Sequence, residues 1–143
     1  MAEDYEAILR KHDDPVYWEQ PPGFDRAAAI GRFKDTHRAL EKALDMTLEA
    51  ETGSEIQDAS FHSQIRMGVF DGELVVIRFS NFGDMVAIAG EESLPAHLFD
   101  HVKETLGARG YVYIPEAVLG PYTGENPGVT GIRDWGIRYL DWV

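Results

Sequence analysis

Two histidines, His97 and His101, stand four residues apart in a segment that the sequence predicts to be helical. On a helix this spacing places both imidazoles on one side, which is the arrangement that a metal site requires. The segment His97-Leu98-Phe99-Asp100-His101 lacks the glutamate that zinc peptidases carry after the first histidine, and no third ligand can be assigned. A solvent-exposed helical face is the favoured interpretation, and neither a metal nor another cofactor is expected.

A further histidine interrupts an otherwise apolar helical stripe, and a buried histidine in that position must pair its ring nitrogens. It could act as a catalytic base, but the sequence identifies neither a nucleophile nor a partner that would orient it. A hydrogen-bonded structural histidine is therefore favoured. If the domain instead holds a pocket between its sheet and its helices, this histidine and four other polar residues are expected to line it: His37, His62, Arg66, Arg78 and Tyr113.

Two groups of aromatic residues are candidate anchors for a protein partner, because Tyr and Trp bury a large area at low entropic cost. Tyr17 and Trp18 lie in a proline-rich connector, where partner binding and packing are equally open. Trp135, Tyr139 and Trp142 recur at steps of four and three near the C-terminus. For these three, core packing is favoured over partner binding, since a terminal helix must bury an apolar face to stay attached.

The usual sequence signatures of catalysis are missing. No serine stands in a Gly-x-Ser-x-Gly context, which excludes the common hydrolase elbow. The glycines from Gly120 to Gly131 are too dispersed for a phosphate-binding Gly-x-Gly-x-x-Gly motif. The sequence therefore favours binding over catalysis, without deciding whether the protein is an enzyme.

The chain carries 25 acidic and 13 basic side chains, which give a formal net charge of -12. Nucleic-acid binding depends on Lys and Arg that neutralise phosphates, so this charge argues against a nucleic-acid partner. The same charge would attract a basic protein and accelerate the encounter. Solubility alone also accounts for an acidic surface, and it is the simpler explanation.

Length and composition predict one α+β domain over residues 1–143. The absence of cysteine excludes disulfides and thiolate chemistry, and no apolar run approaches the roughly 20 residues that span a bilayer. The acidic N-terminus lacks the basic-then-apolar layout of a secretory signal. We therefore expect a cytoplasmic protein without membrane contact, whose oligomeric state the sequence does not determine.

Hydrophobic periodicity indicates which elements hold these residues. Apolar residues at three- and four-residue steps predict helices over 3–11 and 25–48, with Asp25 as the N-cap of the second. The dipeptide Asp71-Gly72 suits the type I′ turn of a hairpin. From residue 60 the hydrophobic periodicity changes to two residues. This predicts the strands of an antiparallel meander around the turn, over residues 60–70, 73–79 and 84–89.

The remainder of the chain adds helices and one more strand. Ser93 is expected to cap a third helix, and residues 111–114 form a fourth strand. The proline- and glycine-rich stretch from Pro115 to Gly131 predicts a long loop, either ordered or mobile, and residues 132–143 predict a C-terminal helix. The predicted fold is α+β, with N-terminal helices, an antiparallel three-stranded meander, a helix, a fourth strand and a C-terminal helix.

Two stretches resemble features of small bacterial proteins, residues 79–83 (Phe-Ser-Asn-Phe-Gly) and 132–142 (Ile-Arg-Asp-Trp-Gly-Ile-Arg-Tyr-Leu-Asp-Trp). Some of those proteins resemble the cytoplasmic immunity proteins of polymorphic toxin systems. The resemblance implies a small acidic protein that binds and blocks a toxin domain, and it carries over no functional residue.

The expected function is therefore a protein-binding module of the immunity or inhibitor type that neutralises a basic partner. The alternative is a small ligand-binding domain or enzyme with a pocket between sheet and helices. A structural or oligomerising module is a third possibility. The three differ in what they predict for the sheet faces, because a fully packed face without a cavity would leave no room for a ligand.

Overall fold

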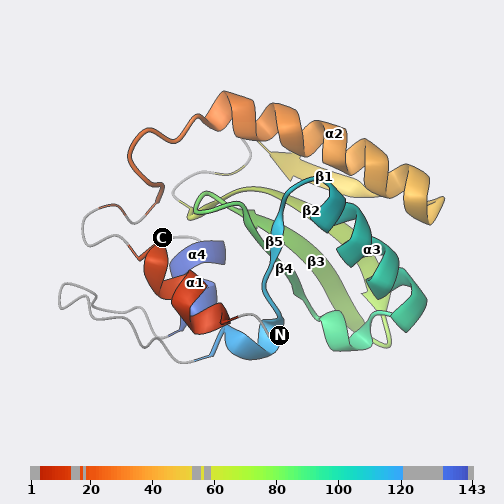
Figure 1. Ribbon diagram of the computed structural model, residues 1–143. Helices are drawn as coiled ribbons and strands as arrows, with labels where there is room; N and C mark the ends of the chain where they lie inside the picture. The colour runs from red at the N-terminus through yellow and green to blue at the C-terminus, as the bar shows by residue number, and fades with distance from the viewer. Residues whose placement is uncertain are drawn as a thin grey trace.

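The computed structural model describes residues 4–13, 17, 19–52, 56, 59–120 and 134–141, and the strands in these ranges form one five-stranded sheet in the order β1-β2-β3-β4-β5 (Figure 1). The strands are β1 (Glu49–Thr52), β2 (Phe61–Phe70), β3 (Glu73–Ser80), β4 (Met85–Ala89) and β5 (Val112–Tyr113). The helices are α1 (Tyr5–Lys11), α2 (Arg26–Leu44), α3 (Ala96–Ala108) and α4 (Trp135–Leu140), with 3-10 turns η2 (Glu91–Ser93) and η3 (Glu116–Val118). The predicted α+β fold class is confirmed.

The strands β2, β3 and β4 form the predicted antiparallel meander. Asp71 and Gly72, between the first two strands, have φ angles of 52° and 81°, the pair of positive values that a type I′ turn requires. Gly83 and Asp84, between the next two, have φ angles of 58° and 57°. Both turns therefore match the twist of the strands that they join.

The helix α2 begins as predicted, because the Asp25 carboxylate accepts a hydrogen bond of 3.0 Å from the backbone N–H of Ala28. It ends at Leu44, before the predicted end, with Asp45 in the left-handed conformation at φ 51°. The chain then forms β1, a strand that the sequence did not predict. Leu48 is buried as its spacing indicated, but it precedes the edge strand of the sheet and lies outside the helix.

Two predictions after the meander are wrong in detail. Ser93 does not cap α3, because it lies in η2 and its hydroxyl donates to the Glu73 carboxylate at 3.3 Å. The fourth predicted strand is β5, which is only two residues long and runs parallel to β4. Since parallel neighbours need a crossover, α3 serves as the connection between these strands. Of the predicted C-terminal helix, the structure describes α4 and the residue on either side of it.

The two faces of the sheet are covered by different helices (Figure 1). We call the face under α2 and α3 the first face, and the face toward α1 and α4 the second face. Burying each large apolar side chain stabilises the fold by about 1.5–3 kcal/mol. The first-face core includes Phe33, Leu40, Ile65, Ile77, Phe79, Val102 and Leu106. The second-face core includes Leu9, Phe82, Met85, Ile114, Trp135 and Tyr139.

A buried ion pair fastens the N-terminal segment to α4. The side chain of Arg138 is fully buried, and its Nε donates to Asp13 Oδ1 at 3.0 Å. Its Nη2 donates to the Tyr17 carbonyl at 3.1 Å, and the guanidinium lies over the rings of Phe82 and Tyr139 at 4.7 and 4.9 Å. The charge is therefore compensated on several sides, which is the condition for burying it.

None of the helices in the described ranges combines the length and the apolar character needed to cross a membrane.

Candidate functional site

Part of the second face carries aliphatic side chains at the surface. Residues alternate along β3, so Leu74, Val76 and Arg78 all lie on this face. Leu74 is 49% exposed, and Val69, its cross-strand partner in β2, is 68% exposed. We call these two residues the aliphatic pair. Exposed apolar side chains that adjoin one another are typical of interaction surfaces.

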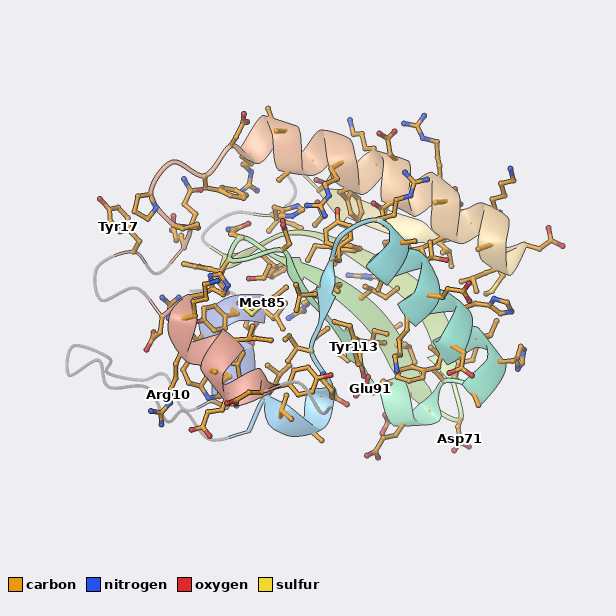
Figure 2. The ribbon with its side chains drawn as sticks, in the orientation of Figure 1. Arg10, Tyr17, Asp71, Met85, Glu91 and Tyr113 are labelled. Atoms are coloured by element: carbon orange, nitrogen blue, oxygen red, sulfur yellow. The ribbon has the colours of Figure 1, made fainter. Side chains whose placement is uncertain are left out.

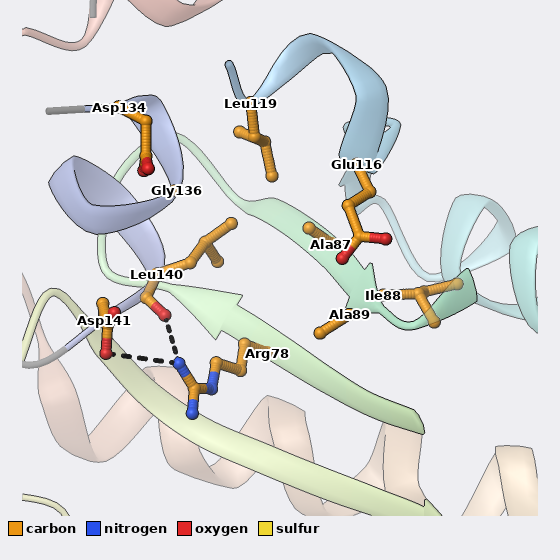
Figure 3. A pocket seen from close by; sticks show the side chains of 10 residues that line it. All are labelled: Arg78, Ala87, Ile88, Ala89, Glu116, Leu119, Asp134, Gly136, Leu140 and Asp141. Carbon is orange, nitrogen blue, oxygen red and sulfur yellow. Dashed lines mark hydrogen bonds and ion pairs between the residues drawn. The ribbon is translucent and has the colours of Figure 1, made fainter. Parts of the chain in front are cut away.

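Next to the aliphatic pair, the second face is hollowed by a pocket of about 420 Å³, which we call the Arg78 pocket (Figure 3). Val76 pairs with Ala89 across the sheet and so connects the two features. The apolar walls come from β4, from the end of η3 and from α4, with Ala87, Ala89, Leu119, Gly136 and Leu140 among the lining residues.

Arg78 is held rigidly at one side of the pocket. Its Nη1 donates to the Leu140 carbonyl at 2.8 Å and lies 3.5 Å from Asp141 Oδ1, as the dashed lines in Figure 3 show. Its Nε donates to Gln64 Oε1 at 3.0 Å. Burial lowers the pKa of the Arg78 guanidinium, and the Asp141 carboxylate acts in the opposite direction, so the group stays charged.

Among the described lining residues, three carboxylates face one guanidinium: Glu116, Asp134 and Asp141 against Arg78. In Figure 3, the two aspartates belong to the α4 side of the pocket and Glu116 to the η3 side. Glu116 is fixed in place, because its carboxylate accepts a hydrogen bond of 3.1 Å from the backbone N–H of Gly90. An apolar wall that carries carboxylates suits a long aliphatic side chain that ends in a cation, as in Lys and Arg.

The five polar residues that the sequence assigned to one pocket do not lie together. Arg78 lines the Arg78 pocket, whereas Arg66 lies nearly half-exposed on β2, where it forms an ion pair of 2.9 Å with Glu51 of β1. His62 lines a different cavity, on the first face. The strands hold each side chain rigidly. Regular alternation would place His62 and Arg66 on one face, but the register shift of β2 between Phe61 and Ser63 turns His62 to the opposite face.

His37 and Tyr113 each have a structural partner. His37 Nε2 lies 2.7 Å from the carbonyl oxygen of Leu48, and its ring stacks on Phe33 with centroids 6.2 Å apart. This is the arrangement of a hydrogen-bonded structural histidine. The Tyr113 hydroxyl donates to the Glu91 carboxylate, and Figure 2 shows the two side chains close together. Burial and the negative charge of Glu91 raise the pKa of Tyr113, so it remains a neutral phenol.

The aromatic candidates are divided between core and surface. Trp135 and Tyr139 are buried in the second-face core, with stacked rings whose centroids lie 5.7 Å apart. They stabilise α4 and present no ring to a partner. Tyr17 is 47% exposed and stays a candidate anchor. Trp18 and Trp142 lie outside the described residues.

His97 and His101 are both exposed on α3. In the part of the chain that the structure describes, no group of three or more His, Asp or Glu side chains is arranged to hold a metal ion. The helical face therefore has the solvated character that its sequence indicated.

The acidic residues of the Arg78 pocket were not singled out from the sequence. Asp134 and Asp141 are seven residues apart, a spacing of two helical turns that places both on one side of a helix. That spacing alone could have predicted that the two carboxylates lie on the same side of the C-terminal helix. No local sequence pattern indicates that Glu116 or Arg78 lies beside these two aspartates, because the long-range packing of α4 against β3 creates the pocket.

Comparison of this chain with protein-family models, with curated proteins and with solved structures finds no match.

Proposed function

We propose that this protein is a protein-binding module of the immunity or inhibitor type, and that a basic protein docks on its second face. A Lys or Arg side chain of the partner enters the Arg78 pocket, and apolar groups around it cover the aliphatic pair. The observation that carries the proposal is the pocket itself, an apolar recess of about 420 Å³ whose described lining residues include three carboxylates and one guanidinium.

The binding energy and the encounter rate come from different features. Arg is among the side chains that most often dominate the binding energy of an interface when they fill a central pocket, whereas residues at the rim contribute little. The net charge of -12 acts over a longer range, by steering a basic partner toward the surface. A partner recognised in this way should bind more slowly as salt is added, and its affinity should still depend on the pocket.

Affinity capture with matched charge variants tests this proposal. The tagged protein is incubated with a lysate of the organism that encodes it, alongside Glu116→Gln/Asp134→Asn and Asp100→Asn/Glu104→Gln. The second pair removes the same two charges from exposed positions on α3, which covers the first face. Mass spectrometry should identify a protein rich in Lys and Arg that the wild type and the α3 control retain and the pocket variant loses.

The captured protein is then purified and mixed with the wild type in defined amounts, and a stoichiometric complex is expected. A partner that binds the pocket variant as well as it binds the control would contradict the proposal. Capture of acidic proteins only would contradict it as well.

A further inference from the structure

A cavity of about 390 Å³ lies on the first face, between the start of α2, the β3–β4 turn and the residue before β5. We call it the His62 cavity. Aromatic and small apolar residues make up part of its wall, including Phe24 and Ala28, and polar residues face them from the sheet side: His62, Asn81 and Tyr111. Its volume falls within the range of small-ligand sites.

Asn81 Oδ1 is a buried polar atom at this cavity with no hydrogen-bond partner among the described residues. The Tyr111 hydroxyl also lacks a well-formed hydrogen bond, although the Thr36 side chain lies near enough to lower its pKa against the effect of burial. Asn81 is 4% exposed and Tyr111 7% exposed. The Asn81 amide cannot turn over, since its Nδ2 donates to the carbonyls of Glu19 and Ala59 at 2.7 and 3.2 Å. An unpaired buried group costs about 1–3 kcal/mol, so native proteins rarely retain one.

His62 adds a third polar group. It is 3% exposed, and burial, assisted by the nearby positive charge of Arg26, lowers its pKa to about 4. The imidazole is therefore neutral near pH 7, with one nitrogen as donor and the other as acceptor. A strongly perturbed pKa in a recess is itself typical of functional sites.

A chain of hydroxyl groups lies behind His62. The Thr52 hydroxyl lies 2.8 Å from the Ser63 hydroxyl and 3.3 Å from the His62 carbonyl oxygen. The Ser63 hydroxyl lies 2.8 Å from His62 Nδ1, so this nitrogen has a partner in either tautomer of the ring. Nε2, which has no hydrogen bond to the described residues, is left for a ligand, and it is an acceptor in the tautomer that carries its proton on Nδ1.

The Arg32 guanidinium at the edge of the cavity is already paired. It forms an ion pair of 2.8 Å with Asp84 and donates to the Arg109 carbonyl at 2.7 Å, while it lies 4.1 Å from the Tyr111 ring centroid. These contacts hold Arg32 in place. An anionic ligand would lie beside the carboxylates of Asp25 and Asp84, which also line the cavity, and would be repelled by them.

We propose that the His62 cavity binds a small uncharged molecule that carries amide or amino N–H groups on a flat apolar ring. The N–H groups donate to His62 Nε2 and Asn81 Oδ1, and the Tyr111 hydroxyl pairs with a polar atom of the same molecule. Phe24, whose ring centroid lies 6.1 Å from that of His62, contacts the ring of the ligand. This site is on the opposite side of the sheet from the Arg78 pocket and does not depend on it.

Nuclear magnetic resonance titration of the 15N-labelled protein with matched probe pairs tests the chemistry. Benzamide and nicotinamide carry the required N–H groups, while benzoate and nicotinate have the same rings with a carboxylate. Both amides should shift the backbone signals around Ala28, His62, Asn81 and Tyr111, with an affinity at least tenfold higher than that of either acid. Shifts that are absent with both amides, or equally strong with the acids, would overturn the proposal.

Variants of the cavity separate binding from folding. Ala28→Leu fills the cavity from α2, and Ala27→Leu places the same side chain on a neighbouring exposed position outside it. Tyr111→Phe removes a hydroxyl that lacks a well-formed hydrogen bond, so stability should change by less than about 1 kcal/mol while amide affinity falls. Amide binding that survives Ala28→Leu as well as it survives Ala27→Leu would place the probes elsewhere and overturn the proposal.

Discussion

His62 shows how one buried residue couples the fold to pH. Burial lowers its pKa from 6.5 to about 4, so between these values the unfolded chain binds a proton that the folded chain excludes. The free energy of unfolding should therefore fall by up to about 3 kcal/mol as the pH decreases from 6.5 to 4. Burial also lowers the pKa of His12, which acts in the same direction.

Urea unfolding at a series of pH values measures this effect in the wild type and in His62→Gln. The variant lacks the titrating ring, so its stability should decline less between pH 6.5 and 4. Parallel curves for the two proteins over that range would show that His62 stays accessible to protons in the folded state.

Arg138 is the residue whose loss should damage the fold most. Replacing it with Met leaves the Asp13 carboxylate buried without its partner, and breaking a buried ion pair in this way costs about 3–5 kcal/mol. Arg10→Met is the matched control, since Arg10 is exposed and its 2.9 Å pair with Glu6 lies at the surface. Chemical denaturation should show a change below about 0.5 kcal/mol for the control. Similar losses in both variants would contradict the buried pairing.

At the scale of elements, the turns of the meander are set by their dipeptides and by what packs against them. Gly83 and Gly72 both have positive φ angles, so alanine at either position carries a backbone cost of about 1–2 kcal/mol. A Cβ on Gly72 meets no atom within 4 Å, whereas one on Gly83 would lie 2.2 Å from the His12 ring. Gly83→Ala should therefore destabilise the protein clearly more than Gly72→Ala in thermal unfolding. Equal losses of stability in the two variants would mean that the His12 ring, at the end of α1, moves away from the added methyl group at no cost.

The meander, the capped start of α2 and the first turn were predictable because local signals and tertiary packing agree there. Asp25 caps the helix it precedes, and Asp71-Gly72 adopts the turn that the dipeptide favours. The strand β1 was not predicted because Leu48 continues the helical spacing of apolar residues. The segment is a strand because it pairs with β2, and no local pattern indicates that pairing. The parallel orientation of β5 depends on the crossover of α3, which no short stretch of sequence encodes.

The candidate site was less predictable than the fold. Arg78 was recognised as a pocket residue, but the residues expected beside it lie on other elements or on the other face. The carboxylates of the Arg78 pocket come from η3 and from the two ends of α4, elements that are held against β3 and β4 by the long-range packing of the second-face core. Periodicity assigns a residue to a face, whereas a pocket requires the relative positions of several elements.

For the whole molecule, the proposed binding combines long-range attraction by the net charge with local contacts on the second face. A net charge of -12 is spread over the surface, so it can attract a basic partner from many directions without choosing a docking site. The aliphatic pair and the Arg78 pocket determine the docking site, which lies on the second face. Removing two charges from either face should slow the encounter, but only the loss of pocket charges should raise the dissociation rate.

The most direct test is calorimetric titration of the purified partner into three proteins at about 50 and about 300 mM salt. These are the wild type, Glu116→Gln/Asp134→Asn and the α3 control Asp100→Asn/Glu104→Gln. We expect one-to-one binding, with an affinity at least tenfold weaker for the pocket variant than for the control at both salt concentrations. Equal affinities for the two variants would contradict the claim that a basic side chain of the partner occupies the Arg78 pocket.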